Sequence, residues 1–176
     1  MEFVTNWEGL KKLEIKELRV QNCEFRIRSS ELRYQSYDAK DGLSYDQWEQ
    51  EVPNVINNSP LWDSVFYRKA LYLYDQTWDD CRVLMKDVRG KAVASQLIRS
   101  VGSISANIEE GYSRGFGKDY ARFLRIALGE DRESQGWYYR VRHLLPKESI
   151  TDRMELLDEI IRLLVSVIKT QQSPVR

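Results

Sequence analysis

Basic side chains in the second half of the chain have the spacing that a nucleic-acid-binding surface needs. Lys118, Arg122, Arg125 and Arg132, here called the basic row, follow one another at intervals of four, three and seven residues. Residues at these intervals lie on one face of an α-helix. Because a row of cations on one face can neutralise the phosphates of RNA or DNA, the spacing predicts a candidate nucleic-acid-binding site.

The segment GWYYRVRHL combines aromatic and cationic side chains. Arg140 and Arg142 stand here beside Trp137, Tyr138 and Tyr139. Aromatic rings can stack on bases while guanidinium groups hold phosphates, so both arginines join the candidate site. The same pattern also suits rings that belong to the core or to an interface, with the arginines on a solvated face. Both interpretations stay open at the level of the sequence.

The ionisable residues do not form a set typical of an enzyme. His143 is the only histidine, and Arg140 stands three residues before it, so the Glu-x-x-His pairs of di-metal bundles are absent. Glu109 and Glu110 are adjacent and point about 100° apart around a helix, so they cannot flank one reacting bond. We expect no catalytic residues, no metal and no cofactor, and we expect His143 to interact with the last carbonyl groups of a helix.

Composition restricts the partners and the compartment. The 176 residues include 27 Lys and Arg and 27 Asp and Glu, so a nucleic-acid partner must be argued from a local patch. The chain has no apolar run long enough to span a membrane and no export signal at its start. Cys23 and Cys81 lack CxxC spacing and suit reduced thiols. We therefore expect a cytoplasmic protein without a membrane partner.

The elements that must position these residues are helices. Four Pro and nine Gly fall between long segments in which apolar residues recur every three or four positions, a pattern typical of an all-α protein. Ser59 and Pro60 suit the start of the first helix, Gly90 the position just past its end, and Pro146 the end of the third. The pattern predicts an antiparallel up-down four-helix bundle, with helices at about 60–88, 91–111, 118–145 and 149–171.

The N-terminal residues are predicted to form an extension that precedes the bundle domain. Residues 1–44 have no sustained period: the segment EGLKKLEIKELRV suits a short amphipathic helix, whereas Cys23, Phe25 and Ile27 alternate with charged residues as in a strand. Residues 45–172 are predicted to form the bundle domain. They begin with a short lead-in helix that Ser44 can cap and that carries Trp48 on its apolar face.

Small and polar residues are frequent in the predicted second helix. In the segment SQLIRSVGSISANIEEGYSRG, the small residues Gly102, Ser103, Ser105 and Ala106 would let neighbouring helices approach closely. Asn107 lies beside the apolar positions and is expected to hydrogen-bond a helix end or a loop. Gly111 is expected to end the helix.

That segment, followed by RFLRIALG at 122–129, resembles the four-helix-bundle proteins encoded in intervening sequences of bacterial 23S ribosomal RNA genes. The family also includes the accessory variability determinant of diversity-generating retroelements. The matching pattern fixes over a dozen residues, although Gln96 stands one place early, and the resemblance covers about residues 60–170. Its structural motif residues include Arg99, Asn107, Glu110, Gly111 and Gly129.

The resemblance implies a ring-shaped homopentamer without enzymatic activity. For the retroelement branch it implies a basic surface that binds nucleic acid and a reverse transcriptase partner. Residues 61–172 carry only 18 basic against 16 acidic residues, a net charge of +2, so a ring would be needed to concentrate the basic rows of several copies. Our first hypothesis is an accessory factor that binds RNA or DNA. The alternative is a structural or protein-interaction module whose arginines form salt bridges between subunits.

Overall fold

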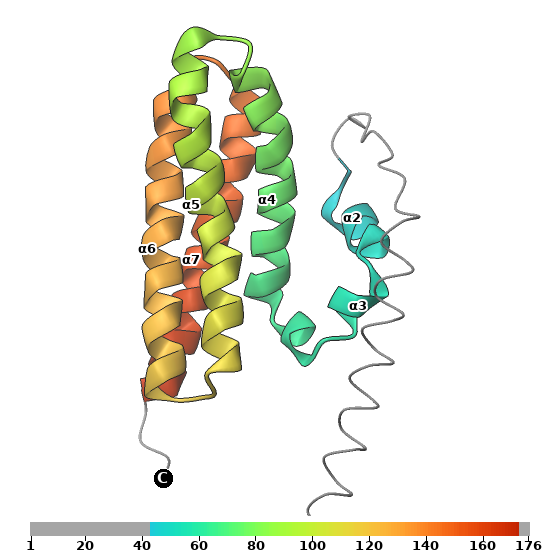
Figure 1. The fold of residues 1–176 in the computed structure, drawn as a ribbon, viewed down its shortest axis with the longest axis vertical. Coiled ribbons are helices and arrows are strands. Elements are labelled where there is room, and N and C mark those ends of the chain that lie inside the picture. The colour runs from blue at the N-terminus through green and yellow to red at the C-terminus, as the bar shows by residue number, and fades with distance from the viewer. Residues whose placement is uncertain (1–42, 173–176) are drawn as a thin grey trace, which may run out of the picture. The chain divides into compact units, whose positions relative to one another are not determined.

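The structure is a computed structural model that describes residues 43–172 (Figure 1). All of these residues belong to one compact unit, Asp41–Arg176. The predictions made for residues 1–42, namely the amphipathic segment and the alternating segment around Cys23, lie outside the described residues.

Four long helices form a bundle. They are α4 (Val65–Leu84), α5 (Val88–Ser113), α6 (Lys118–Val141) and α7 (Lys147–Gln172). Each packs against the next along the chain, and α7 also packs against α4, which closes the bundle (Figure 1). Short loops join consecutive helices, so neighbours run antiparallel. The predicted all-α, up-down four-helix bundle is confirmed.

The core of the bundle consists of the apolar residues that recur every three or four positions. Burying one such side chain stabilises the fold by about 1.5–3 kcal/mol, so each helix contributes several of these increments. The large aliphatic side chains that are fully buried among the described residues are Leu73, Leu84, Leu97, Val101, Ile104, Ile108, Leu124, Val141, Leu157, Ile160 and Leu164.

The first predicted helix, 60–88, is wrong at both ends. Pro60–Asp63 is a separate 3-10 turn, η1, in which the Ser59 hydroxyl accepts a hydrogen bond of 3.3 Å from the Leu61 N–H. Ser64 then adopts an extended backbone, so α4 starts at Val65. The turn buries its apolar side chains, Leu61 and Trp62, and packs against α4.

The expectation that Gly90 lies past a helix end is also wrong. The Asp87 side chain accepts a hydrogen bond of 2.8 Å from the Arg89 N–H and caps α5, which places Gly90 inside its first turn. A Cβ atom at Gly90 would overlap the carbonyl oxygen of Leu84. The glycine therefore permits the end of α4 and the start of α5 to lie in close contact.

The other helix boundaries differ by a few residues from the prediction. The helix α5 extends past Gly111 to Ser113, so this glycine does not end it. The helix α6 stops at Val141, four residues early, because the chain then forms a turn before Pro146. The helix α7 starts directly after that proline, whose carbonyl accepts the first hydrogen bond from Ile150.

A lead-in segment precedes the bundle, as the sequence predicts. It contains α2 (Tyr45–Glu51), capped by Ser44, and the short α3 (Asn54–Asn57). The buried Trp48 indole donates a hydrogen bond of 2.6 Å to the Asp75 carboxylate of α4. This contact holds the lead-in segment against the bundle.

A buried polar network joins three helices. The Tyr138 hydroxyl of α6 donates to Asp80 of α4 at 2.9 Å and lies 2.7 Å from the Thr77 hydroxyl. Arg153 of α7 donates to the same carboxylate at 2.9 Å. Burial raises the pKa of Asp80, while the charge and hydrogen bond of Arg153 lower it.

Candidate nucleic-acid interface

The loop before α6 determines where the basic row begins. Gly115 and Gly117 have φ angles of +95° and +84°, a conformation that favours glycine and turns the chain sharply between α5 and α6. The Gly117 N–H donates a hydrogen bond of 2.8 Å to the Gln171 side chain of α7. The start of α6 is therefore tied to the last turn of α7.

The structure places the basic row on the solvent side of α6. Residues on the opposite side of the helix, including Phe123, Leu124 and Ala127, are buried in the core. The four cations of the row are all exposed, and within the part of the chain that the structure describes none of them forms an ion pair. The four cations therefore lie on one exposed face of α6, as their spacing predicts.

Two members of the basic row contact their own helix. The Arg122 guanidinium lies 4.8 Å from the centre of the Phe123 ring. Arg125 donates a long hydrogen bond of 3.4 Å to the Ala121 carbonyl. Neither contact neutralises the positive charge, so both guanidinium groups keep donors for phosphate oxygens.

Arg140 and Arg142 diverge from each other. Arg140 lies eight residues after Arg132 and continues the basic row on the same side of α6, with its guanidinium 4.9 Å from the centre of the Trp137 ring. Arg142 follows the end of α6, stacks 4.0 Å from the Tyr139 ring centre and donates to the Tyr139 carbonyl. The structure thus groups Arg140 with the row and separates Arg142 from it.

The aromatic residues of this segment divide between the two interpretations. Tyr138 is fully buried, so it belongs to the core. Trp137 is half-buried and donates a hydrogen bond of 3.0 Å to Glu133, whereas the Tyr139 ring is 59% exposed. Only the exposed ring could stack on a base.

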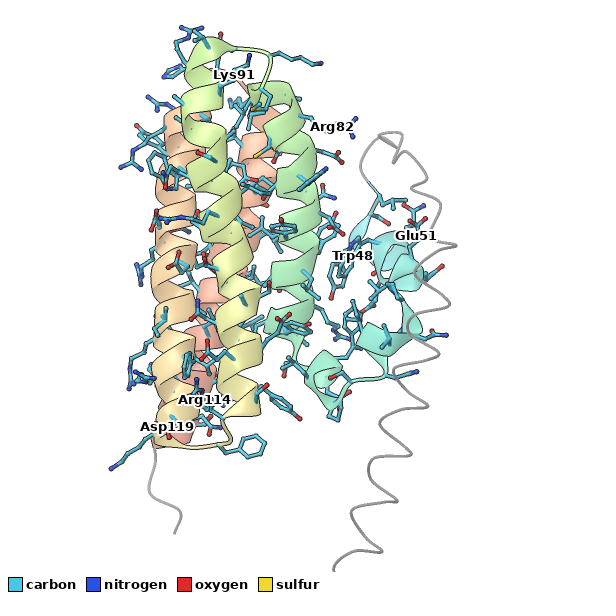
Figure 2. All side chains as sticks on the ribbon, in the orientation of Figure 1. Trp48, Glu51, Arg82, Lys91, Arg114 and Asp119 are labelled. Carbon is cyan, nitrogen blue, oxygen red and sulfur yellow. The ribbon has the colours of Figure 1, made fainter. Side chains whose placement is uncertain are left out.

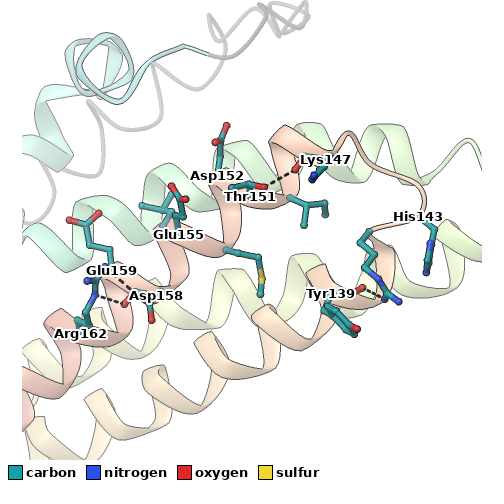
Figure 3. Close-up of a pocket in the computed structure, with 13 residues that line it drawn as sticks. Tyr139, His143, Lys147, Thr151, Asp152, Glu155, Asp158, Glu159 and Arg162 are labelled. Atoms are coloured by element: carbon teal, nitrogen blue, oxygen red, sulfur yellow. Dashed lines mark hydrogen bonds and ion pairs between the residues drawn. The ribbon is translucent and has the colours of Figure 1, made fainter.

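Arg142 lies in a different surface feature, an open groove between the end of α6 and α7 (Figure 3). The groove has a volume of about 1070 Å³, and its basic lining residues are Arg142, His143, Lys147 and Arg162. Its acidic lining residues, which lie along α7, are Asp152, Glu155, Asp158 and Glu159. Because these carboxylates repel phosphate, the groove is a poorer nucleic-acid site than the basic row.

His143 stands in the turn after α6 and is exposed. Among the described residues its ring makes no hydrogen bond to the last carbonyl groups of that helix, so the expected interaction is not present as a direct contact. The described part of the chain also contains no cluster of three or more histidine, cysteine, aspartate or glutamate residues that could hold a metal ion.

The loop between α5 and α6 presents an exposed aromatic ring beside the start of the basic row. The Phe116 ring is 77% exposed and meets Tyr112 and Tyr120 edge-on, with centroid distances of 6.1 and 6.2 Å. Arg114, labelled beside Asp119 at this end of the bundle in Figure 2, lies 5.5 Å from the Phe123 ring centre. The sequence signal for this ring is the RGFGK segment, in which an aromatic residue stands between two cations.

Two structural motif residues of α5 make local contacts. Asn107 donates a hydrogen bond of 2.7 Å to the Ser103 carbonyl of its own helix, so the expectation of a helix end or loop is wrong. Glu110 forms an ion pair of 2.7 Å with Arg114 at the end of the helix. Both side chains therefore have a hydrogen-bond partner within the same helix or at its end.

The other motif residues have distinct surroundings. Gly111 is buried, and a Cβ atom there would lie 2.7 Å from the Cβ of Phe123, so it permits α5 and α6 to approach closely. Arg99 is exposed and lowers the pKa of Glu130, which burial raises. Gly129 is exposed on α6 between Arg125 and Arg132.

The predicted close approach at the small residues of α5 occurs at Gly102. A Cβ atom there would lie 3.0 Å from the Tyr74 ring of α4.

Within the described residues no helix is long and apolar enough to cross a membrane.

Comparison with known proteins gives a matching family and similar solved structures. The model of the family described as 23S rRNA-intervening sequence protein matches residues 63–166. The chain is also similar to the crystal structure of a protein of unknown function from the S23 ribosomal protein family of Bacteroides thetaiotaomicron. The two share 27% sequence identity and a TM-score of 0.56, over 60% of this chain and 99% of that chain. No curated protein matches the chain.

Proposed function

This chain belongs to the family of 23S rRNA-intervening sequence proteins, and we propose that it is a non-enzymatic accessory factor that binds RNA or DNA through the basic row on α6. The observation that carries the proposal is the exposure of these four cations together with their lack of ion pairs among the described residues. Cations arranged in this way gain most of their interaction energy from an external polyanion.

The ion pairs of cations outside α6 support this proposal. Among the described residues, seven arginines and lysines outside α6 pair with carboxylates at 2.7–3.2 Å: Arg68, Lys69, Arg82, Arg89, Arg114, Arg153 and Arg162. A solvated surface whose charges serve only solubility commonly intersperses both signs in this way. The basic row departs from that arrangement, which supports a partner that carries negative charge.

The proposal includes self-association. One copy carries a net charge of only +2 over residues 61–172, so a single row binds phosphate weakly at physiological salt. A homopentameric ring, which the family resemblance implies, would bring five rows to one assembly. We place this assembly in the cytoplasm, with a reverse transcriptase as a possible protein partner of the complex.

The test is the salt dependence of binding. Fluorescence anisotropy with a labelled RNA hairpin, and with a DNA duplex of the same sequence, gives the dissociation constant at several salt concentrations. The double variant Arg122→Ala/Arg125→Ala should weaken binding and lower the slope of log K against log salt by about two, because each lost phosphate contact removes about one counterion.

The matched control is Arg82→Ala/Arg162→Ala. It removes the same charge from two exposed arginines that are already paired with Asp79 and Asp158. This control should bind as the unaltered protein does. Equal weakening by both double variants would contradict a site on α6 and would indicate a response to net charge alone.

A protein-interaction module is the second candidate function. Apolar side chains are exposed near the turn between α4 and α5: Trp78, Met85 and Val88 are 55%, 52% and 80% exposed. Such side chains suit contact with a protein. In this case binding of RNA or DNA would be absent. The row's arginines would then pair with carboxylates of neighbouring copies, and light scattering would show that Arg122→Ala/Arg125→Ala breaks the oligomer.

A further inference from the structure

The middle of the basic row holds a glycine that no contact within the described chain requires. Gly129 follows Arg125 by four residues and precedes Arg132 by three, so it lies between them on the exposed side of α6. A glycine inside a helix weakens the helix because it loses more conformational freedom on folding than any other residue. A Cβ atom built on Gly129 would contact no atom within 4 Å.

The other glycines inside the long helices differ from Gly129 in this respect. A Cβ atom would meet a neighbouring group closely at each of Gly90, Gly102, Gly111 and Gly136. At the last of these, the neighbour is the guanidinium of Arg140, at 2.7 Å. Backbone and aromatic neighbours account for Gly90, Gly102 and Gly111, whereas the flexible Arg140 side chain at Gly136 can move aside. Gly129 has no neighbour of either kind among the described residues. Another physical reason for a helical glycine is close approach of the backbone to a group outside the described residues.

The charges around Gly129 indicate which kind of partner contacts α6 at this position. Arg125 and Arg132 have no ion-pair partner within the described residues, and they lie on either side of the glycine along the helix. Of the nearby carboxylates, Glu133 accepts the hydrogen bond of Trp137, Glu130 interacts with Arg99, and Asp131 is buried on the core side of the helix. A second copy of α6 would bring like charges together at this position, whereas a phosphate would be held by both guanidinium groups.

We propose that the phosphodiester backbone of the bound nucleic acid crosses α6 at Gly129, where the missing side chain lets it contact the helix between Arg125 and Arg132. This inference rests on the proposed function and adds the point of closest contact. Gly129 acts as a positioning residue because it admits the strand, while the flanking arginines supply the charge.

The test compares Gly129→Ala and Gly129→Leu with the unaltered protein, using the labelled RNA hairpin and DNA duplex described above. Alanine should raise the thermal unfolding midpoint by a few degrees, since it is a better helix former and meets no clash. It should nevertheless weaken binding about fivefold, and leucine should weaken it further. Because no charge changes, the salt slope should stay that of the unaltered protein, in contrast to the arginine double variant.

Ser166→Ala is the control, because Ser166 is an exposed position of α7 where alanine also favours the helix. It should leave binding unchanged. If Gly129→Ala binds as tightly as the unaltered protein while Arg122→Ala/Arg125→Ala binds weakly, the proposed function survives and the crossing point at Gly129 is wrong. If Gly129→Ala lowers the mass of the oligomer in light scattering, the glycine serves contact between copies and the inference is overturned. If the unaltered protein binds neither nucleic acid, both proposals fail together.

Discussion

The hydroxyl of Tyr138 on α6 donates a hydrogen bond of 2.9 Å to the Asp80 carboxylate on α4, inside the core of the bundle. Arg153 of α7 donates to the same oxygen. One carboxylate therefore receives donors from two other helices. Since both donors must keep their geometry, this network constrains how α4, α6 and α7 are rotated relative to one another.

Removal of either donor should destabilise the bundle. Arg153→Ala leaves the buried Asp80 carboxylate without its counter-charge and should lower the free energy of unfolding by about 3 kcal/mol. Tyr138→Phe should cost about 1–3 kcal/mol. Urea unfolding measures both. Arg162→Ala removes the exposed pair with Asp158 and should cost less than about 1 kcal/mol. A similar loss for Arg153→Ala and Arg162→Ala would show that the buried network contributes no more than a surface pair.

Asp131 should make the protein less stable as pH rises through neutrality. Its side chain is fully buried, and neither carboxylate oxygen has a hydrogen-bond partner among the described residues. Burial raises its pKa to about 8; the Arg132 charge lowers the pKa and the Asp158 charge raises it. The folded state therefore holds a proton that the unfolded chain releases near its ordinary pKa of 3.8.

The sign of this effect follows from proton linkage. Between about pH 4 and pH 8 the folded state binds more protons than the unfolded state, so the free energy of unfolding falls with pH. The slope approaches about 1.4 kcal/mol per pH unit and vanishes above pH 8. Asp131→Asn should remove this contribution. Because burial also raises the pKa of Asp75 and Asp80, the measurement is the difference in slope between variant and unaltered protein in urea unfolding. Identical slopes would mean that Asp131 is ionised in the folded protein.

Gly90→Ala should destabilise the protein, in contrast to Gly129→Ala. A Cβ atom at position 90 overlaps the backbone carbonyl of Leu84, which cannot move without a shift of the α4–α5 turn. We expect a loss of about 1–3 kcal/mol. Calorimetry of the two variants side by side measures this. An increase in the unfolding temperature of Gly90→Ala would show that the turn is looser than the packing indicates.

Trp48→Phe should loosen the lead-in segment without unfolding the bundle. The change keeps an aromatic ring but removes the hydrogen bond to Asp75, so amide hydrogen exchange should accelerate in residues 43–58. Exchange in α5 and α7 should stay unchanged. Uniform acceleration in all helices would instead indicate that the lead-in segment folds cooperatively with the bundle.

The sequence determined the fold class and the side of α6 that carries cations. Apolar residues every three or four positions leave one buried face for each helix, and the spacing of Lys118, Arg122, Arg125 and Arg132 is independent of any neighbour. Helix α2 could also be predicted, because the capping box of Ser44 and Gln47 is a local interaction. These features depend on residues close together in the chain.

The packing contacts, hydrogen bonds and side-chain positions that involve more than one helix became known only from the tertiary structure. Gly90 read as a helix end until its contact with Leu84 placed it inside α5, and no periodicity could show that Asp80, Tyr138 and Arg153 meet in one network. Arg142 lies in a segment rich in aromatic and basic residues, but α6 ends at Val141, and Arg142 lines the groove between the end of α6 and α7. Only the structure shows that Gly129, unlike the other glycines inside the long helices, has no neighbouring atom within 4 Å of an added Cβ atom. Each of these outcomes depends on atoms contributed by distant parts of the chain, which residue types and spacing alone do not specify.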